Sequence, residues 1–222
     1  MTTTTTLASL ATTHPAASRV FRRTGLDYCC GGGQTLADAC APKGLDPRDI
    51  LSAIAAEEES VDLPRWDTAP LPELVAFIIH RYHDALRTEL PALIALADKV
   101  ERRHASTPDC PVGLRDALEC MHERVIEHIE KEERVLFPLI LNRCPGLDTP
   151  IEVLTEEHDE HGRDLNTLRL YTNSFTPPAH ACASWRALYL RLDSLATDLM
   201  QHIHLENNVL FKRALQERES RS

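Results

Sequence analysis

Two twelve-residue segments of this chain carry the same residues at the same offsets. The first begins at His128 and the second at His202, and they share His, Ile, Glu, Val, Leu and Phe. In each segment the His is followed four residues later by a Glu, Glu132 in the first and Glu206 in the second. Because residues four apart lie one above the other on a helix, each imidazole and its carboxylate can face one point.

Each segment also has a His upstream at a matching distance. His83 lies 45 residues before His128, and His158 lies 44 residues before His202. One His-x-x-x-Glu pair alone is common on a solvated helix surface. Two copies with matched upstream His residues indicate one site around a pseudo-two-fold axis in a bundle of four helices.

This set of side chains predicts a dinuclear metal centre. Imidazole and carboxylate together suit iron, manganese or zinc. If each Glu bridges two metals, the six side chains supply about four bonds to each, and an oxo or hydroxo bridge adds one more. A position then stays open for a small exogenous ligand. The predicted ligands are His83, His128, Glu132, His158, His202 and Glu206.

Composition excludes several classes of protein. The hydrophobic share of 43% and the charged share of 26% are ordinary for a globular protein, and the net charge of −10 argues against a nucleic-acid partner. Apolar runs such as Leu74 to Ile79 and, counting Pro138, Leu136 to Leu141 are too short to span a membrane. Seven Cys, an odd number, do not suggest a disulfide framework. With no signal-like N-terminus, we expect a cytoplasmic protein.

Helical periodicity dominates the chain, and strand signals are almost absent, so we expect an all-α fold. The predicted domains are a small helical N-terminal domain (1–62), a Pro-rich linker (63–72) and a helical bundle (73–222). Long helical patterns cover about 71–104, 111–143, 148–173 and 178–217.

Local signals refine these expectations. Residues 1 to about 12 are Thr-rich, and we expect them to be disordered. Two or three short helices follow up to Ser60, one of them opened by Asp46 and Pro47. Pro91 and Pro138 should kink or split the helices in which they lie.

The remaining His residues have more ordinary interpretations. His80 and His161 each lie three residues from a predicted ligand but have no counterpart in the repeat, so we expect supporting or surface roles. We expect His122 to be structural and His204 to be solvated, while His104 could approach the centre only if its helix bends. The paired Val-Leu-Phe runs at 135–137 and 209–211 should pack in the core.

The segment Asp27-Tyr-Cys-Cys-Gly-Gly-Gly-Gln34 is the second unusual element. Its glycines permit a tight turn, in which Cys29 and Cys30 would be small packing residues. The same glycines could instead leave two thiols open to accept iron, sulfide or a reducing equivalent. Both interpretations stay open.

Taken together, these motifs resemble the hemerythrin-like di-iron family implicated in Repair of Iron Centres. The matching residues are Asp-Tyr-Cys29-Cys30-Gly-Gly, Arg-Tyr-His83-Asp, His128 with Glu132, Glu-His158-Asp, and His202 with Glu206. The resemblance extends from about Leu7 to Leu215. It implies an up-and-down four-helix bundle that holds two non-haem iron ions, joined by carboxylates and an oxo or hydroxo bridge, with His nitrogen ligands and bridging Glu132 and Glu206.

The resemblance also implies partners. These are iron–sulfur proteins damaged by nitric oxide or oxidants, which would be repaired by iron donation, and nitric oxide or another small diatomic ligand. A nitric oxide buffer, a slow nitric oxide reductase and a sensor stay open as alternatives, so enzymatic activity is undecided. A homodimer is also left open, and no membrane partner is expected.

Overall fold

The computed structural model describes residues 1–58 and 65–219, and every regular element in these ranges is helical. The helices are α1 (Leu7–Thr13), α2 (Ala17–Thr24), α3 (Leu36–Cys40), η1 (Ala41–Lys43), α4 (Pro47–Glu58), α5 (Leu71–Ile78), η2 (Ile79–His83), α6 (Asp84–His104), α7 (Leu114–Lys131), η3 (Glu132–Leu136), α8 (Phe137–Leu141), α9 (Asp148–Tyr171), α10 (Ala183–His204), η4 (Leu205–Leu210) and α11 (Phe211–Glu219). This confirms the all-α prediction.

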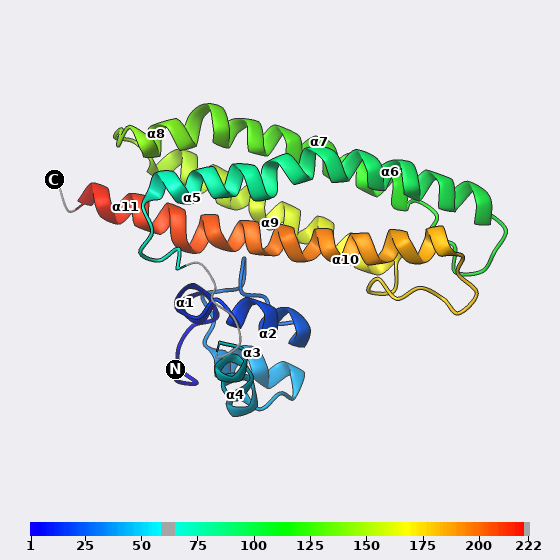
Figure 1. Ribbon diagram of the computed structural model, residues 1–222, viewed down its shortest axis with the longest axis horizontal. Helices are drawn as coiled ribbons and strands as arrows, with labels where there is room; N and C mark the ends of the chain where they lie inside the picture. The colour runs from blue at the N-terminus through cyan, green and yellow to red at the C-terminus, as the bar shows by residue number, and fades with distance from the viewer. Residues whose placement is uncertain (59–64, 220–222) are drawn as a thin grey trace. The chain divides into compact units, whose positions relative to one another are not determined.

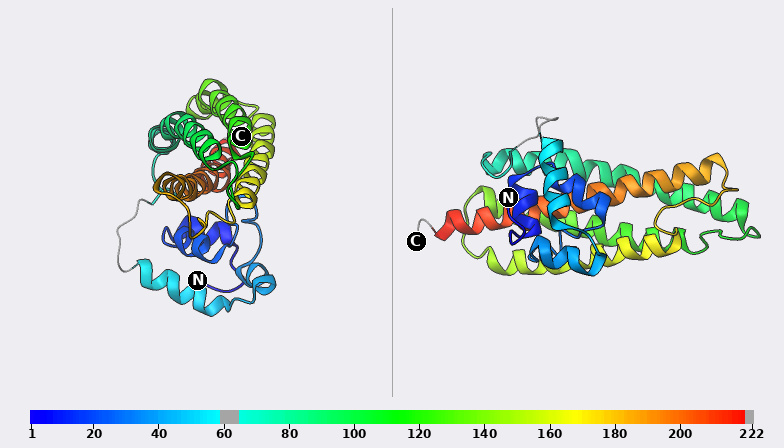
Figure 2. Two further views of the ribbon diagram at one scale, coloured as in Figure 1. Left: turned by 90° about the vertical axis from the view of Figure 1, so that its right-hand side faces the viewer. Right: turned by 90° about the horizontal axis from the view of Figure 1, so that it is seen from below.

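Four long helices, α6, α7, α9 and α10, form an up-and-down bundle. Each runs back along the preceding one (Figure 1), and they lie side by side when viewed end-on (Figure 2). α6 packs on α7, which in turn packs on α9. Ion pairs join the first and last of the four, with Arg191 Nε 2.7 Å from Glu89 Oε1. The predicted bundle is therefore confirmed.

The chain forms two compact units, Phe77–Leu199 and Met1–Ala76 together with Met200–Ser222. The predicted domain boundaries remain a prediction. Residues 59–62 of the expected N-terminal domain, 63–64 of the expected linker and 220–222 of the expected bundle lie outside the described residues. Within residues 1–58 and 65–219, no helix is long and apolar enough to span a membrane.

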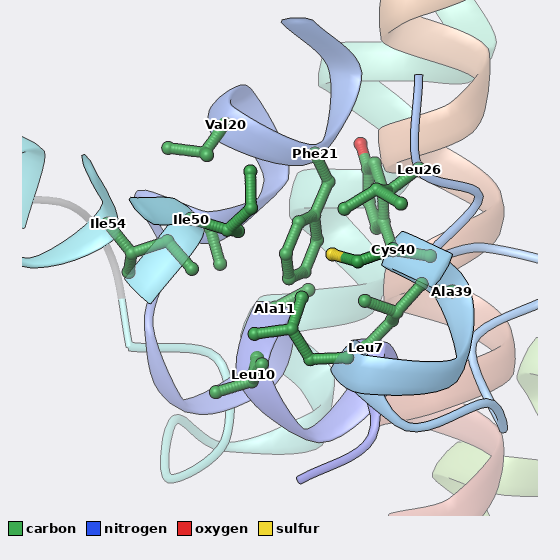
Figure 3. Packing of buried hydrophobic residues seen from close by; sticks show 13 residues of the cluster. Leu7, Leu10, Ala11, Val20, Phe21, Leu26, Ala39, Cys40, Ile50 and Ile54 are labelled. Atoms are coloured by element: carbon green, nitrogen blue, oxygen red, sulfur yellow. The ribbon is translucent and has the colours of Figure 1, made fainter. Parts of the chain in front are cut away.

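The N-terminal helices pack around a core centred on Phe21, which has no exposed surface (Figure 3). The expectation of disorder for residues 1–12 is wrong, because α1 begins at Leu7. The side chain of Thr6 caps this helix by accepting a hydrogen bond from the Ser9 N–H at 3.2 Å. Leu7 and Leu10 are buried in the same core, so a short apolar face outweighs the polar composition.

Of the prolines considered above, Pro47 and Pro138 lie at helix starts and Pro91 lies inside a helix. Pro47 opens α4, and Asp46 Oδ1 accepts a hydrogen bond from the Arg48 N–H at 2.8 Å, as expected. Pro138 lies in the first turn of α8, where a missing N–H costs little. Pro91 does not split its helix, since α6 runs without a break from Asp84 to His104.

Three π-helical turns interrupt the α-helices, and the sequence patterns did not reveal them. They are η2, η3 and η4, and each contains one predicted ligand: His83, Glu132 and Glu206 respectively. A π turn holds one residue more than an α turn and is frequent at functional sites. Half of the predicted ligands, among them both Glu residues, therefore lie in the irregular parts of otherwise regular helices.

Candidate metal centre

His83, the last residue of η2, is completely buried. Its Nδ1 lies 2.8 Å from Oε1 of Glu133, and its ring stacks on Phe137 with 5.7 Å between centroids. A carboxylate at Nδ1 favours the tautomer that carries its proton there and directs the lone pair of Nε2 toward a metal. Burial raises the pKa of Glu133, but hydrogen bonds from Arg87 and His83 outweigh burial and lower it overall.

His128 and His158 converge through their Nε2 atoms, which are 2.9 Å apart. Nδ1 of His128 lies 2.8 Å from Glu157 Oε2, and Lys131 Nζ donates to Glu157 Oε1 at 2.7 Å. The hydrogen bonds from His128 and Lys131 lower the pKa of Glu157 to about 2, although burial opposes them. Two imidazole nitrogens at this separation can bind one ion jointly.

Glu132 begins η3, and its side chain has no exposed surface. Oε2 lies 3.4 Å from Nε2 of His83 and 3.5 Å from Nε2 of His128. Oε1 lies 4.0 Å from Nε2 of His158. One carboxylate thus approaches three imidazole nitrogens, as a bridging ligand would.

The second His-x-x-x-Glu pair has a similar local arrangement. Nε2 of His202 lies 2.8 Å from Oε1 of Glu206, and both side chains are buried. Glu206 lies in η4 just as Glu132 lies in η3. In each copy, a His near the end of an α-helix is followed by a Glu in the π turn that continues it.

These side chains form two groups that could hold a metal ion, and within each group one ligand atom per residue lies within 4.8 Å of the others. The groups are His83, Glu132, His202 and Glu206, and His128, Glu132, His158 and Glu206. Both carboxylates belong to both groups, which indicates a dinuclear site. A buried carboxylate is costly without a compensating charge, so two of them among four imidazoles fit a pair of cations.

Neither group contains His80, His104 or His122. His80 is exposed and lies 3.3 Å from Asp84 Oδ2, and His122 is half-buried. His104 Nε2 lies 3.2 Å from the Sγ of Cys182 at the C-terminal end of α6. These contacts give none of the three a role in the candidate centre.

His161 and His204 are both buried. The ring of His161 lies edge-on to that of His128, with 4.8 Å between centroids. The expectation that His204 is solvated is wrong, because its ring packs against Tyr28 with 5.3 Å between centroids. Burial lowers the pKa of His204 to about 4, so its imidazole is neutral at pH 7.

The Val-Leu-Phe runs pack in the core with one exception. Leu136 and Phe137 are buried in the first run, as are all three residues of the second, 209–211. Val135 is 51% exposed, so its expected core position is wrong. It lies in η3 between Glu132 and Leu136, on the side of the turn that faces away from the core.

The two adjacent thiols lie in a turn that Asp27 organises. Asp27 Oδ1 accepts hydrogen bonds from the backbone N–H groups of Cys29 and Cys30, both at 3.1 Å. The two Sγ atoms are 3.9 Å apart, and both cysteines are in the reduced thiol form. The hydrogen bond to Cys30, burial and Asp27 all raise the pKa of Cys29, which keeps this thiol protonated.

Close packing explains one glycine of this turn. A Cβ on Gly32 would lie 2.5 Å from the carbonyl oxygen of Tyr28, a distance that no side chain tolerates. On the opposite side, the Asn208 Nδ2 donates to the carbonyl oxygen of Cys29 at 3.3 Å. Packing therefore accounts for the shape of the turn.

The structure also places polar residues that the spacing analysis did not single out. Glu133 and Glu157 contact the Nδ1 atoms of His83 and His128, as described above. Their only signal in the sequence is adjacency to a predicted ligand. Because neighbours in sequence point in different directions on a helix, helical spacing gave no reason to select them.

Comparisons with known proteins agree with this geometry. Residues 75–214 match the hemerythrin HHE cation binding domain, and residues 3–58 match a domain of unknown function (DUF542). The iron-sulfur cluster repair protein YtfE of Cronobacter sakazakii is 48% identical over 210 residues, which cover 94% of this chain and 95% of the relative. Those of Escherichia coli O17:K52:H18 and Dickeya chrysanthemi are 47% and 45% identical, each with 94% and 96% covered. The chain therefore belongs to the YtfE family of hemerythrin-like proteins.

Proposed function

We propose that this chain is a di-iron protein that repairs iron–sulfur clusters damaged by nitric oxide or oxidants, by donating iron to them. The observation that carries the proposal is the pair of buried His/Glu groups that share Glu132 and Glu206. It occurs in a chain 45% identical to an iron-sulfur cluster repair protein over 94% of its length.

The donor set favours iron that is held but can leave. Nitrogen and oxygen donors of this kind suit iron, and the proposed ligands are the six residues of the repeat. Only Glu132 and Glu206 bring formal negative charge into the two groups. Two ferrous ions carry twice that charge, so electrostatic retention is limited. Iron is thus at once the resident metal and the cargo.

The protein supplies orientation and a dry environment. Glu133 and Glu157 hold His83 and His128 with Nε2 directed inward, and all six proposed ligands have at most 1% of their surface exposed. Bound ferrous iron would supply an open coordination position that attracts nitric oxide. We therefore include nitric oxide binding at the same centre in the proposal.

A nitric oxide buffer, slow reductase or sensor is the second candidate. It is favoured by the same burial, because a closed bundle admits a diatomic molecule more readily than it releases an ion. Cys29 and Cys30 would assist either activity only if the partly exposed Cys30 is the reacting thiol, since the Cys29 thiol is buried and held protonated.

The proposed setting is the cytoplasm, and the proposed clients are damaged iron–sulfur proteins. A homodimer stays among the assemblies to be tested. Light scattering on the purified protein measures that assembly without reference to activity.

Anaerobic incubation of the ferrous protein with a nitrosylated dehydratase tests the function. We expect dehydratase activity to recover beyond the level that an equal concentration of free ferrous iron gives. His83→Ala should abolish this gain, while His80→Ala, a change at an exposed imidazole three residues away, should preserve it. No gain above free iron, together with a stable nitric oxide complex, would leave a nitric oxide buffer.

A further inference from the structure

A chain of three side chains leads from the protein surface to one proposed ligand. Arg87 donates from Nη1 to Glu133 Oε1 and from Nη2 to Glu133 Oε2, both at 2.9 Å. Glu133 Oε1 in turn lies 2.8 Å from Nδ1 of His83. The exposed fraction falls along the chain, from 35% for Arg87 to 26% for Glu133 and 0% for His83. The guanidinium therefore acts on His83 through a carboxylate that both groups share.

The second copy of the internal repeat has different residues at the positions of Arg87 and Glu133. Glu133 follows the bridging Glu132, and Asn207 occupies the same offset after Glu206. Arg87 lies four residues after His83, where the other upstream His, His158, has Gly162. At these two offsets the second copy therefore has neither an acidic nor a basic residue.

The second carboxylate behind a ligand, Glu157, is equally unrepeated. It contacts His128 Nδ1 and is held by Lys131. In the other copy, Tyr82 occupies the position equivalent to Glu157, and Leu205 occupies the position equivalent to Lys131. Neither the carboxylate nor the cation is therefore repeated. His83 and His128 belong to different metal groups, so each group contains a His whose Nδ1 contacts a carboxylate.

An anionic acceptor at Nδ1 changes what the metal receives at Nε2. A carboxylate that accepts the Nδ1 proton makes the imidazole a stronger donor, and such outer partners alter metal affinity by about 10–100-fold. A stronger anionic donor favours the ferric state over the ferrous state. The bidentate guanidinium withdraws part of that charge, because its Nη1 donates to the same Oε1 that lies against His83 Nδ1.

We propose that Glu133 is a positioning residue that sets the donor strength of His83, and that Arg87 sets how much of the Glu133 charge reaches it. The inference rests on the proposed di-iron function. Removing the carboxylate charge weakens His83 as a donor, whereas removing the cation strengthens it. The two changes therefore shift the reduction potential of the centre in opposite directions.

A purely structural ion pair makes a different prediction. Arg87 in α6 and Glu133 in η3 join two helical stretches, and if that were their whole role, removing either residue would loosen the site in the same way. Potential and iron release would then change in the same direction in both variants. Opposite signs separate the two roles.

The test uses Glu133→Gln and Arg87→Met in the full-length, iron-loaded protein. The amide of Gln can still accept the Nδ1 proton, so this change removes charge with little change of shape. We expect Glu133→Gln to raise the midpoint potential and to release ferrous iron to a chelator about 10–100-fold more readily. We expect Arg87→Met to lower the potential.

A matched pair elsewhere provides the control. Arg191 and Glu89 form a similar bidentate pair, at 2.7 and 2.9 Å, with exposed fractions of 38% and 35%, and they touch no proposed ligand. Glu89→Gln and Arg191→Met should leave potential and iron release unchanged. Circular dichroism of all four variants checks that the helices remain folded.

The outcomes distinguish this inference from the function on which it rests. If the wild-type protein binds two irons, but the midpoint potential shifts in the same direction in Glu133→Gln and Arg87→Met or shifts in neither, this inference is overturned and the proposed function is not. If Glu133→Gln is folded but retains no iron, that loss agrees with this inference. The direction in which Arg87→Met shifts the midpoint potential then decides, and a raised potential would overturn the inference. A wild-type protein that binds no iron would refute the proposed function and this inference together.

Discussion

Replacing Glu132 by Gln should make the metal-free protein more stable and the metal-loaded protein less stable. The carboxylate has no exposed surface, and the Nε2 atoms of His83 and His128 lie 3.4 and 3.5 Å from its Oε2. Burying an ionised carboxylate costs several kcal/mol, of which these imidazoles offset only a part. The isosteric amide removes that cost, so we expect the free energy of unfolding without metal to rise by about 1–3 kcal/mol.

Thermal unfolding measures this directly. For a chain of this length, each kcal/mol moves the midpoint by roughly 2–4 °C, so the metal-free variant should melt roughly 2–12 °C above the metal-free wild type. Ferrous iron under anaerobic conditions should then raise the wild-type midpoint, by about 2.7 kcal/mol at a hundred times the dissociation constant. The variant should gain little, because it lacks a carboxylate common to both metal groups.

Two results bear on the reasoning. If metal-free Glu132→Gln melts below the metal-free wild type, the carboxylate stabilises the fold by itself and our account of its burial is wrong. Glu89→Gln serves as control, since it removes a half-exposed carboxylate paired with Arg191. That change should cost at most about 1 kcal/mol with or without metal.

Three further outcomes are expected. Leu10→Ala should lower the free energy of unfolding of the N-terminal helices by about 2–5 kcal/mol, whereas Ser9→Ala on the exposed face of α1 should not; denaturant titration distinguishes α1 from a disordered tail. His204→Ala should cost about 2–3 kcal/mol by leaving a cavity beside Tyr28, yet leave the iron content at the wild-type level in elemental analysis. Replacing Cys29 and Cys30 by Ser should also leave iron content unchanged; a loss of dehydratase recovery would give the thiols a role in repair, and unchanged recovery would return them to packing.

The ligand set was accessible from the sequence because helical spacing and metal chemistry impose the same constraint. A His and a Glu four residues apart must share a helix face, and the repeat places that face twice in the chain. The six residues selected in this way are the ones that the two metal groups contain.

Other features depended on packing that no local pattern encodes. His204 lies two residues after His202, so helical spacing turns it away from the proposed ligand. The ring of Tyr28, a residue far away in the sequence, packs against it. α1 was missed because its apolar face is short and follows a run of Thr, one of which is the cap. Glu133 and Glu157 escaped notice because their partners come from other helices, which periodicity along one helix cannot identify.

The π turns have a consequence for how such a centre can be gained or lost. Inserting one residue into an α-helix rotates everything beyond it by about 100° and would expose half of a buried face. A π turn absorbs the extra residue locally, and helices on both sides of η3 and η4 keep buried side chains such as Ile129, Ile140, Ile203 and Ala214. α9, which carries His158, needs no such turn and is α-helical from Asp148 to Tyr171. At the points where its carboxylates lie, the helices thus accommodate one extra residue each, and the hydrophobic core on both sides of the turn stays in phase.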